Sequence, residues 1–230
     1  MDRSVFHRPV LFLHLRMIFQ LLQNDIRFPN PALAEEDGLL AVGGDLSAER
    51  LMEAYAKGIF PWFSEGDPLL WYAPHERCVI YPHSIKISKS MKQVLRSNRF
   101  TITTNTAFAD VIKNCANTPR HDQDGTWITD EMQEAYINLH SKGVAHSVEV
   151  WSDGLLVGGL YGITVGKVFC GESMFSLQSN ASKTALIWLC QQGLYELIDC
   201  QLPNKHLLSV GAIMLDSEGY INILRSQSAF

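Results

Sequence analysis

In three stretches of the chain, apolar residues at helical spacing follow a residue that can cap the N-terminus of a helix. The caps are Ser47, Ser88 and Thr129, and each hydroxyl can accept a hydrogen bond from a free backbone amide of the first turn. A glycine follows the first and third stretches and favours the left-handed backbone that ends a helix. The pattern therefore predicts helices over residues 47–58, 88–98 and 129–143.

Alternation of apolar and polar residues after the third helix is typical of consecutive antiparallel strands. Ser152-Asp153-Gly154 is a turn signal, and further glycines are expected to mark bends or turns. Asn180 or Ser182 then opens a helix through Gln191, which precedes a short strand and a final helix. The further glycines are Gly158, Gly159, Gly162 and Gly166. The predicted strands are 146–151, 155–164, 167–175 and 197–201.

This order of elements predicts an α+β fold in which helices flank a mixed sheet. We expect a small N-terminal α/β domain over residues 1–78 and a second domain over residues 79–230. The first domain includes a turn-bounded apolar stretch at 37–46 and an aromatic loop at 58–63. Residues 1–16 are expected to be either an extension or the result of a start codon assigned too early, because the patterned part of the chain begins after them.

Composition narrows the class of protein. Hydrophobic residues make up 47% of the 230 residues and charged residues 19%, so the chain can bury enough apolar surface for a globular core. The five cysteines are scattered and never form C-x-x-C pairs, which indicates a reducing cytoplasm. No stretch is long and apolar enough to span a bilayer. We therefore expect a cytoplasmic protein with no membrane partner.

Positive charge is concentrated locally, although the net charge is −5. Residues 77–109 contain no acidic residue and six basic ones, beginning with Arg77. Lys89, Lys92 and Arg96 share one face of the predicted helix, and apolar residues occupy the opposite face. The basic face is either an ordinary solvated surface or a platform for RNA phosphates.

Seven short strings occur in one order that resembles the leucyl/phenylalanyl-tRNA–protein transferases, and the resemblance spans residues 28–212. It implies an enzyme that moves leucine, phenylalanine or methionine from aminoacyl-tRNA to proteins beginning with arginine or lysine, which marks them for proteolysis. It also implies a second domain with the fold of the GCN5-related acyltransferases and no cofactor, and we expect a monomer. The strings are GLLAVGGDLS (38–47), GIFPWFSEGDPLLWYAP (58–74), GTWIT (125–129), HSVEVW (146–151), FCGESMFS (169–176), NASKTAL (180–186) and LIDCQ (197–201).

Two other functions stay open on the residues alone. An acyl-CoA-dependent acyltransferase of the same fold would normally carry a Q/R-x-x-G-x-G/A run around the cofactor pyrophosphate, and the loop 176–182 lacks it. A non-enzymatic RNA-binding module would use only the basic face. Further chemistries find little support, because G-x-S-x-G is absent and the eight histidines show no metal-ligand spacing. No metal is expected.

Asp199, Cys200 and Gln201 are the first candidate catalytic motif. In an extended strand alternate side chains share a face, so Asp199 and Gln201 would lie together and Cys200 would be a spacer on the other face. From spacing alone, such a pair is usually a surface or structural hydrogen bond. The resemblance implies that Gln201 contacts the attacking amine and that Asp199 polarises or orients it.

Glu172 is the third candidate catalytic residue. It follows an apolar strand and needs a partner to offset the cost of burying a carboxylate, unless it is a surface residue at the strand end. The resemblance favours contact with the cationic acceptor or its amine. It also implies an apolar pocket for the leucine or phenylalanine side chain, although the same residues would equally form ordinary core. The pocket residues are Phe169, Gly171, Ser173, Met174, Leu186 and Ile198.

Trp62 and Trp127 lie in loops flanked by glycine or proline, where a large aromatic residue either anchors the loop or stacks on a base. We expect them to stack on the terminal adenine of the tRNA or to gate the pocket. Lys183 and Lys205 can reach backbone phosphates, although isolated lysines usually only keep a surface solvated. Of these two lysines, Lys183 is predicted to contact the tRNA together with the basic helix face.

Overall fold

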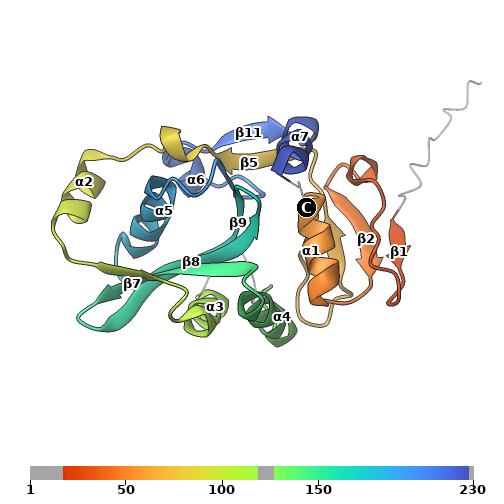
Figure 1. Cartoon of the computed structure of the whole chain (residues 1–230), viewed down its shortest axis with the longest axis horizontal. Helices are drawn as coiled ribbons and strands as arrows, with labels where there is room; N and C mark the ends of the chain where they lie inside the picture. The colour runs from red at the N-terminus through yellow and green to blue at the C-terminus, as the bar shows by residue number, and fades with distance from the viewer. Residues whose placement is uncertain (1–17, 119–126, 228–230) are drawn as a thin grey trace, which may run out of the picture.

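The computed structural model describes residues 18–118 and 127–227, which form two β-sheets and seven α-helices (Figure 1). The expected extension at residues 1–16 lies outside the described residues. The smaller sheet has the strand order β1-β2-β4-β3, in which β1 runs parallel to β2 and the other neighbours are antiparallel. Its strands are β1 (Phe19–Leu21), β2 (Leu39–Gly43), β3 (Phe60–Pro61) and β4 (Leu70–Tyr72).

The larger sheet has the order β11-β5-β10-β9-β8-β7-β6. All its neighbours are antiparallel except β9 and β10, which run parallel. This mixed sheet confirms the predicted α+β class. Its strands are β5 (Glu76–Ile80), β6 (Thr101–Thr104), β7 (Ala145–Ser152), β8 (Leu155–Val165), β9 (Val168–Ser176), β10 (Leu197–Asp199) and β11 (Ile213–Asp216).

The three capped helices form as the sequence predicts. Ser47, Ser88 and Thr129 each accept a hydrogen bond from a backbone N–H of the first turn. Gly58 and Gly143 follow the first and third of these helices with positive φ, which glycine adopts without steric cost. The helices are α1 (Ala48–Ala56), α2 (Lys89–Arg96), α3 (Phe108–Asn117), α4 (Asp130–Ser141), α5 (Ala181–Gln191), α6 (Lys205–Ser209) and α7 (Ser217–Gln227), with 3-10 turns at Pro31–Leu33 and Pro82–Ser84.

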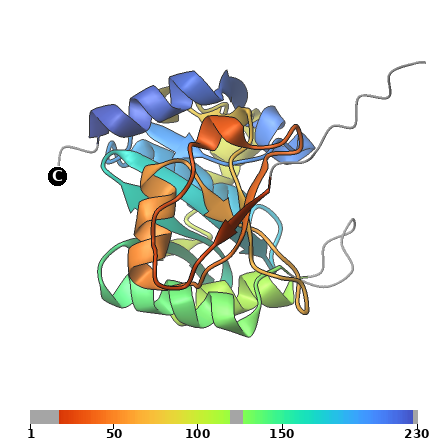
Figure 2. The same ribbon diagram turned by 90° about the vertical axis from the view of Figure 1, so that its right-hand side faces the viewer.

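Helices cover both faces of the larger sheet (Figure 1). One face packs on α5, and the other packs on α3 and α4. The smaller sheet and α1 stand at one end of the larger sheet, and Figure 2 shows them from that end with α7 and α4 on opposite sides. Trp71 and Tyr55 of this part belong to the same buried core as Phe108, Tyr136 and Leu224, so one hydrophobic core joins the two sheets.

The predicted meander is confirmed as β7, β8 and β9. Only some of its glycines lie at the bends or turns that the sequence predicted. Gly166 takes positive φ between β8 and β9, whereas Gly158 lies within β8 where α5 packs closely. A Cβ at Gly158 would lie 2.4 Å from Ala181 Cβ, so this glycine is needed for close packing rather than for a turn.

Two expected boundaries differ from the structure. The strand expected over residues 197–201 ends at Asp199, because Gln201 takes φ +55 and interrupts the regular strand, although the backbones of Cys200 and Gln201 still hydrogen-bond to Cys78 of β5. The division near residue 78 stays a prediction, although β5 already belongs to the larger sheet and begins at Glu76. Among the residues described, no helix is both long and apolar enough to cross a lipid bilayer.

Candidate active site

The candidate site lies where β9 continues beyond the end of its parallel neighbour. Asp199, the last residue of β10, pairs with Cys170 of β9, and β9 runs on to Ser176. The edge of β9 beyond Cys170 is therefore not covered by β10. Gly171 to Met174 line a pocket of about 310 Å³ there, together with residues that follow β10.

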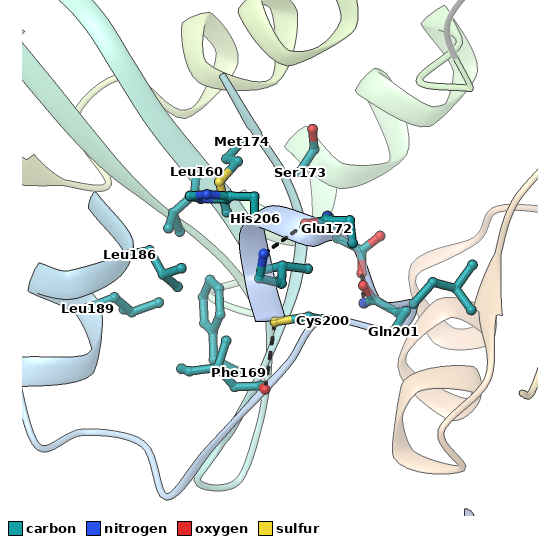
Figure 3. A pocket seen from close by; sticks show the side chains of 15 residues that line it. Leu160, Phe169, Glu172, Ser173, Met174, Leu186, Leu189, Cys200, Gln201 and His206 are labelled. Atoms are coloured by element: carbon teal, nitrogen blue, oxygen red, sulfur yellow. Dashed lines mark hydrogen bonds between the residues drawn. The ribbon is translucent and has the colours of Figure 1, made fainter. Parts of the chain in front are cut away.

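This pocket has an apolar side and a polar side. Figure 3 shows Leu186, Leu189 and Phe169 on one side and Glu172 and Gln201 on the other. All six residues predicted to hold an aminoacyl side chain line it, which confirms that they lie together and leaves their role as a prediction. The lining residues are Leu160, Phe169, Gly171, Glu172, Ser173, Met174, Leu186, Leu189, Ile198, Cys200, Gln201, Leu202, Asn204, His206 and Leu207.

Asp199 lies behind the pocket and is not one of the residues that line it. Its carboxylate is fully buried and forms an ion pair with Arg77 of β5, with 2.8 Å between Arg77 Nη2 and Asp199 Oδ2. The hydroxyl of Tyr220 on α7 also donates a hydrogen bond to Oδ2, at 2.7 Å. Burial alone would lower the pKa of Arg77, but the adjacent Asp199 carboxylate raises it above its usual value.

This finding corrects two expectations. Arg77 begins the basic stretch of the sequence, but it is not a surface residue: it is 1% exposed, and its Nη1 donates to the backbone oxygen of Gly58 at 2.9 Å. Asp199 is held by Arg77 and Tyr220 and so does not face the pocket. Any effect of Asp199 on a substrate must pass through a neighbouring residue.

Gln201 is that neighbour. Its backbone N–H donates to Asp199 Oδ1 at 2.9 Å, while its side-chain Nε2 donates to Glu172 Oε1 at 3.2 Å. The two residues are therefore linked as expected, but through the backbone of a turn rather than by strand alternation. The expectation for Cys200 is wrong, because this side chain also lines the pocket instead of lying on an opposite face.

Glu172 has the partners that its position requires. Besides Gln201, the hydroxyl of Tyr136 on α4 donates to Glu172 Oε2 at 3.3 Å, and Tyr136 is hydrogen-bonded to Tyr55 of α1. Burial raises the pKa of Glu172 to about 7, and the nearby Asp199 charge acts in the same direction. Hydrogen bonds from the two tyrosines oppose this shift. The carboxyl group can therefore change its charge near neutral pH.

Neither predicted tryptophan lines the pocket. Trp62 is half-buried against Tyr72 of the smaller sheet, with 5.5 Å between the ring centroids. Trp127 is also half-buried, on the segment that precedes α4. Gating of the pocket and stacking on a tRNA base both stay predictions for these two residues.

The basic helix has the two faces that its sequence predicts. Lys89, Lys92 and Arg96 are exposed on α2, and Met91 is buried on the opposite side. In Figure 1, α2 lies at the end of the molecule away from the smaller sheet. Lys183 is half-buried in the first turn of α5, while the lysine at 205 is exposed at the start of α6.

Several residues of the site were not predicted from the sequence. Arg77 could have been suspected from its place in the apolar run Cys78-Val79-Ile80, where an unpaired charge would be costly. No short sequence pattern indicated that Tyr55 and Tyr136 lie beside Glu172, or that Tyr220 bonds to Asp199. His206 also lines the pocket; its Nε2 is buried with no hydrogen-bond partner among the described residues, and burial lowers its pKa, helped by the charge of Lys183.

Comparison with known proteins places these features in a family. The family model described as leucyl/phenylalanyl-tRNA protein transferase matches residues 79–225, and a model of the N-terminal domain of the same family matches residues 44–75. The second match lies within the part of the chain that contributes α1 and the smaller sheet.

Curated relatives agree over most of the chain. A leucyl/phenylalanyl-tRNA–protein transferase of Flavobacterium johnsoniae is 53% identical and covers 90% of this chain and 99% of its own length. The enzyme of the same name from Hydrogenovibrio crunogenus is 51% identical, with coverage of 91% and 84%. One of the similar solved structures is a GCN5-related N-acetyltransferase from Kribbella flavida, at 11% identity over 70% of this chain and 58% of that chain, with a TM-score of 0.35. From the two family models and these close relatives, the chain belongs to the leucyl/phenylalanyl-tRNA–protein transferase family.

Proposed function

We propose that this chain transfers leucine, phenylalanine or methionine from aminoacyl-tRNA to the N-terminal arginine or lysine of acceptor proteins, which marks them for proteolysis. The observation that carries the proposal is a pocket with an apolar side beside Phe169 and Leu186 and a hydrogen-bonded polar side at Glu172 and Gln201. An apolar side chain would enter the first side, and its reactive ester would then lie near the second. Aminoacyl transfer to protein is also the reaction for which the close relatives are named.

Aminoacyl transfer depends more on alignment of the amine with the ester than on a strong nucleophile. An aminoacyl ester is already activated, and an α-amine with a pKa of about 7.7 to 8.0 is roughly one-tenth neutral at pH 7. Alignment of two reactants contributes on the order of 7 to 11 kcal/mol to lowering a barrier. A site in which Gln201 and Glu172 are fixed by hydrogen bonds suits this task.

We assign three roles to the polar side. Gln201 contacts the attacking amine, and its carboxamide is held by Glu172. Glu172 receives the cationic amine and takes up one of its protons, which its pKa of about 7 supports, so that the nitrogen lone pair can attack the ester carbonyl. The new C–N bond replaces the ester C–O bond, and the tRNA 3′-oxygen leaves with a proton as the terminal hydroxyl group. Asp199 keeps the Gln201 backbone in place through the 2.9 Å hydrogen bond, and Arg77 holds the Asp199 carboxylate through the buried ion pair.

The apolar side selects the donor amino acid. Phe169, Met174, Leu186 and Ile198 present no charge to a bound side chain, and Leu189 and Leu160 complete this wall. A charged aminoacyl group would lose its hydration there without a partner. Leucine, phenylalanine and methionine share the property that they avoid this penalty.

Exposed cations on α2, together with Lys183, are the proposed surface for the tRNA backbone. Lys183 lies near enough to the pocket residue His206 for its charge to affect the pKa of that histidine. Trp62 and Trp127 are the proposed stacking partners of the terminal adenine, for which their half-buried positions leave part of each ring open. The remaining proposals are a monomer and a cytoplasmic location, which five free cysteines support.

One assay separates the proposed function from its alternatives. Purified protein is mixed with tRNA charged with radiolabelled leucine and a peptide that begins with arginine, and the label on the peptide is counted. A matched peptide with an acetylated N-terminus is the control, because its amine cannot attack. Transfer to the free peptide alone supports the proposal. Transfer only from leucyl-CoA would favour an acyl-CoA enzyme, and tRNA binding without any product would favour an RNA-binding module.

A further inference from the structure

Two buried tyrosines from different parts of the chain meet behind Glu172. Tyr55 lies on α1, within the N-terminal family match, and Tyr136 lies on α4, within the second match. They are 1% and 0% exposed. Their hydroxyl groups are hydrogen-bonded to each other, and Tyr136 donates to Glu172 Oε2. The helix of the smaller sheet therefore reaches the polar side of the pocket.

The direction of these hydrogen bonds favours one charge state of Glu172. Burial raises the pKa of both Tyr55 and Tyr136 well above the usual value, so each hydroxyl keeps its proton. An ionised carboxylate only accepts hydrogen bonds, so Tyr136 must direct its single proton to Glu172. The oxygen of Tyr136 can then accept the proton of Tyr55. Both phenols thus act in one direction, toward the negative form of the carboxyl group.

The other groups around Glu172 do not replace this effect. Gln201 donates to Oε1 whether or not the carboxyl group is charged. Asp199 on β10 raises the pKa of Glu172, and Arg77 on β5 lowers it from behind Asp199. Cys170 keeps its proton, because burial raises its pKa. The hydrogen bonding that lowers the pKa of Glu172 comes from Tyr136, which donates to it directly, with Tyr55 behind Tyr136.

We propose that Tyr55 and Tyr136 are positioning residues for aminoacyl transfer, which hold Glu172 in place in its ionised form for the incoming cationic amine. This inference rests on the proposed function, in which Glu172 receives that amine. It gives the N-terminal part of the chain a role in the chemistry, because Tyr55 completes the site from α1. Replacing either hydroxyl should make the site accept the amine only at higher pH.

The test uses Tyr55→Phe and Tyr136→Phe in the full chain, since phenylalanine keeps the ring and its packing. Single-turnover leucine transfer to an arginine-starting peptide is measured across pH. Loss of a hydrogen bond to a charged group should move the acid limb of the profile upward by about one pH unit in Tyr136→Phe, and the rate on that limb should fall about tenfold. Tyr55→Phe should shift the limb in the same direction by less, because its hydroxyl acts through Tyr136. The alkaline plateau and tRNA affinity should be retained in both variants. The amine of the peptide titrates equally in all reactions, so it does not produce a difference.

Tyr195→Phe is the matched control, because it also removes one hydroxyl hydrogen bond, to Thr164, away from Glu172. Its pH profile should equal that of the unchanged protein. A second readout needs no activity: the carboxyl carbon resonance of Glu172, identified by its loss in Glu172→Gln, should titrate at higher pH in both tyrosine variants. Each variant is first checked for an unchanged melting temperature.

The outcomes distinguish this inference from the function on which it rests. If the unchanged protein transfers no leucine, the proposed function fails, and the resonance titration alone decides whether the tyrosines act on Glu172. If transfer occurs but both variants keep the acid limb of the pH–rate profile and the titration of the Glu172 resonance unchanged, the tyrosines have no positioning role. A uniform loss of rate at every pH without a shift would show a purely structural role and would also overturn the inference.

Discussion

Arg77 and Asp199 lie 122 positions apart in the sequence and form a buried ion pair with 2.8 Å between Arg77 Nη2 and Asp199 Oδ2. The pair joins β5 to the end of β10, immediately before the turn that carries Gln201. Phe60 and Tyr220 cover the guanidinium group, with 4.9 and 4.7 Å to the ring centroids. The order of the candidate site therefore depends on an interaction that does not touch the pocket.

Removal of one member of this pair should be strongly destabilising. Arg77→Met would leave the Asp199 carboxylate buried without its cation, and loss of one partner of such a pair costs about 3 to 5 kcal/mol. The free energy of unfolding is obtained from denaturant titration. Arg27→Met is the matched control, because Arg27 forms its ion pair with Asp25 at the surface and its loss should change stability little. Equal effects of the two substitutions would contradict the importance of the buried pair.

Glu172 should make the protein less stable as pH rises toward neutrality. Its pKa is raised from 4.5 to about 7, so the folded state binds more protons than the unfolded state between these values. The free energy of unfolding therefore decreases as pH rises through this window. Glu172→Gln should remove about 3 kcal/mol of this decrease, measured by denaturant titration at several pH values. An unchanged slope in the variant would assign the effect to another group.

A larger side chain at Gly171 should prevent the aminoacyl group of the tRNA from entering the pocket. A Cβ at Gly171 would lie 3.6 Å from the backbone oxygen of Asp199, which is an ordinary contact, so Gly171→Val should fold and extend into the pocket. We expect kcat/KM for leucyl- and phenylalanyl-tRNA to fall about 10- to 200-fold, with unchanged affinity for uncharged tRNA. Gly162→Val is the contrast, because its Cβ would lie 2.2 Å from a backbone oxygen and should lower the melting temperature. Full transfer by Gly171→Val would place the donor elsewhere.

The basic face of α2 should determine how tRNA binding depends on salt. Replacing Lys89, Lys92 and Arg96 together with alanine should weaken charged-tRNA binding and flatten the slope of log K against log salt by about 0.7 to 0.9 for each phosphate that the variant no longer neutralises. Lys113→Ala and Lys142→Ala remove exposed charges from α3 and the end of α4 and serve as controls. If the triple variant and the controls give the same slope, α2 is not the tRNA platform.

The local part of the fold could be predicted because its causes are local. Ser47, Ser88 and Thr129 cap the helices that they precede in the sequence, and the alternating residues of the meander form β7 to β9. In the larger sheet the strands β5, β6 and β11 were missed, and so was the helix α3. Pairing of β11 with β5 depends on residues more than 130 positions away, which no short pattern reports.

The site was predicted in part for the same reason. The apolar lining and the residues Glu172, Asp199 and Gln201 came from short strings that resemble a known family. The arrangement of Asp199 and Gln201 was wrong in detail, because a left-handed turn at Gln201 replaced the expected strand. The contacts of Tyr55 and Arg77 arise only when distant segments pack together, so sequence spacing carried no sign of them.

Single-turnover leucine transfer by Asp199→Asn, Gln201→Ala and the double variant shows whether Asp199 acts through Gln201. If Asp199 acts through Gln201, each single variant should slow transfer with little change in charged-tRNA affinity, and the double variant should be scarcely slower than the poorer single one. Cys200→Ser is not a neutral control, because this side chain lines the pocket, so Cys115→Ser, at a buried cysteine on α3, serves as the control. Full transfer rates in folded Asp199→Asn and Gln201→Ala, or losses that multiply in the double variant, would contradict the account.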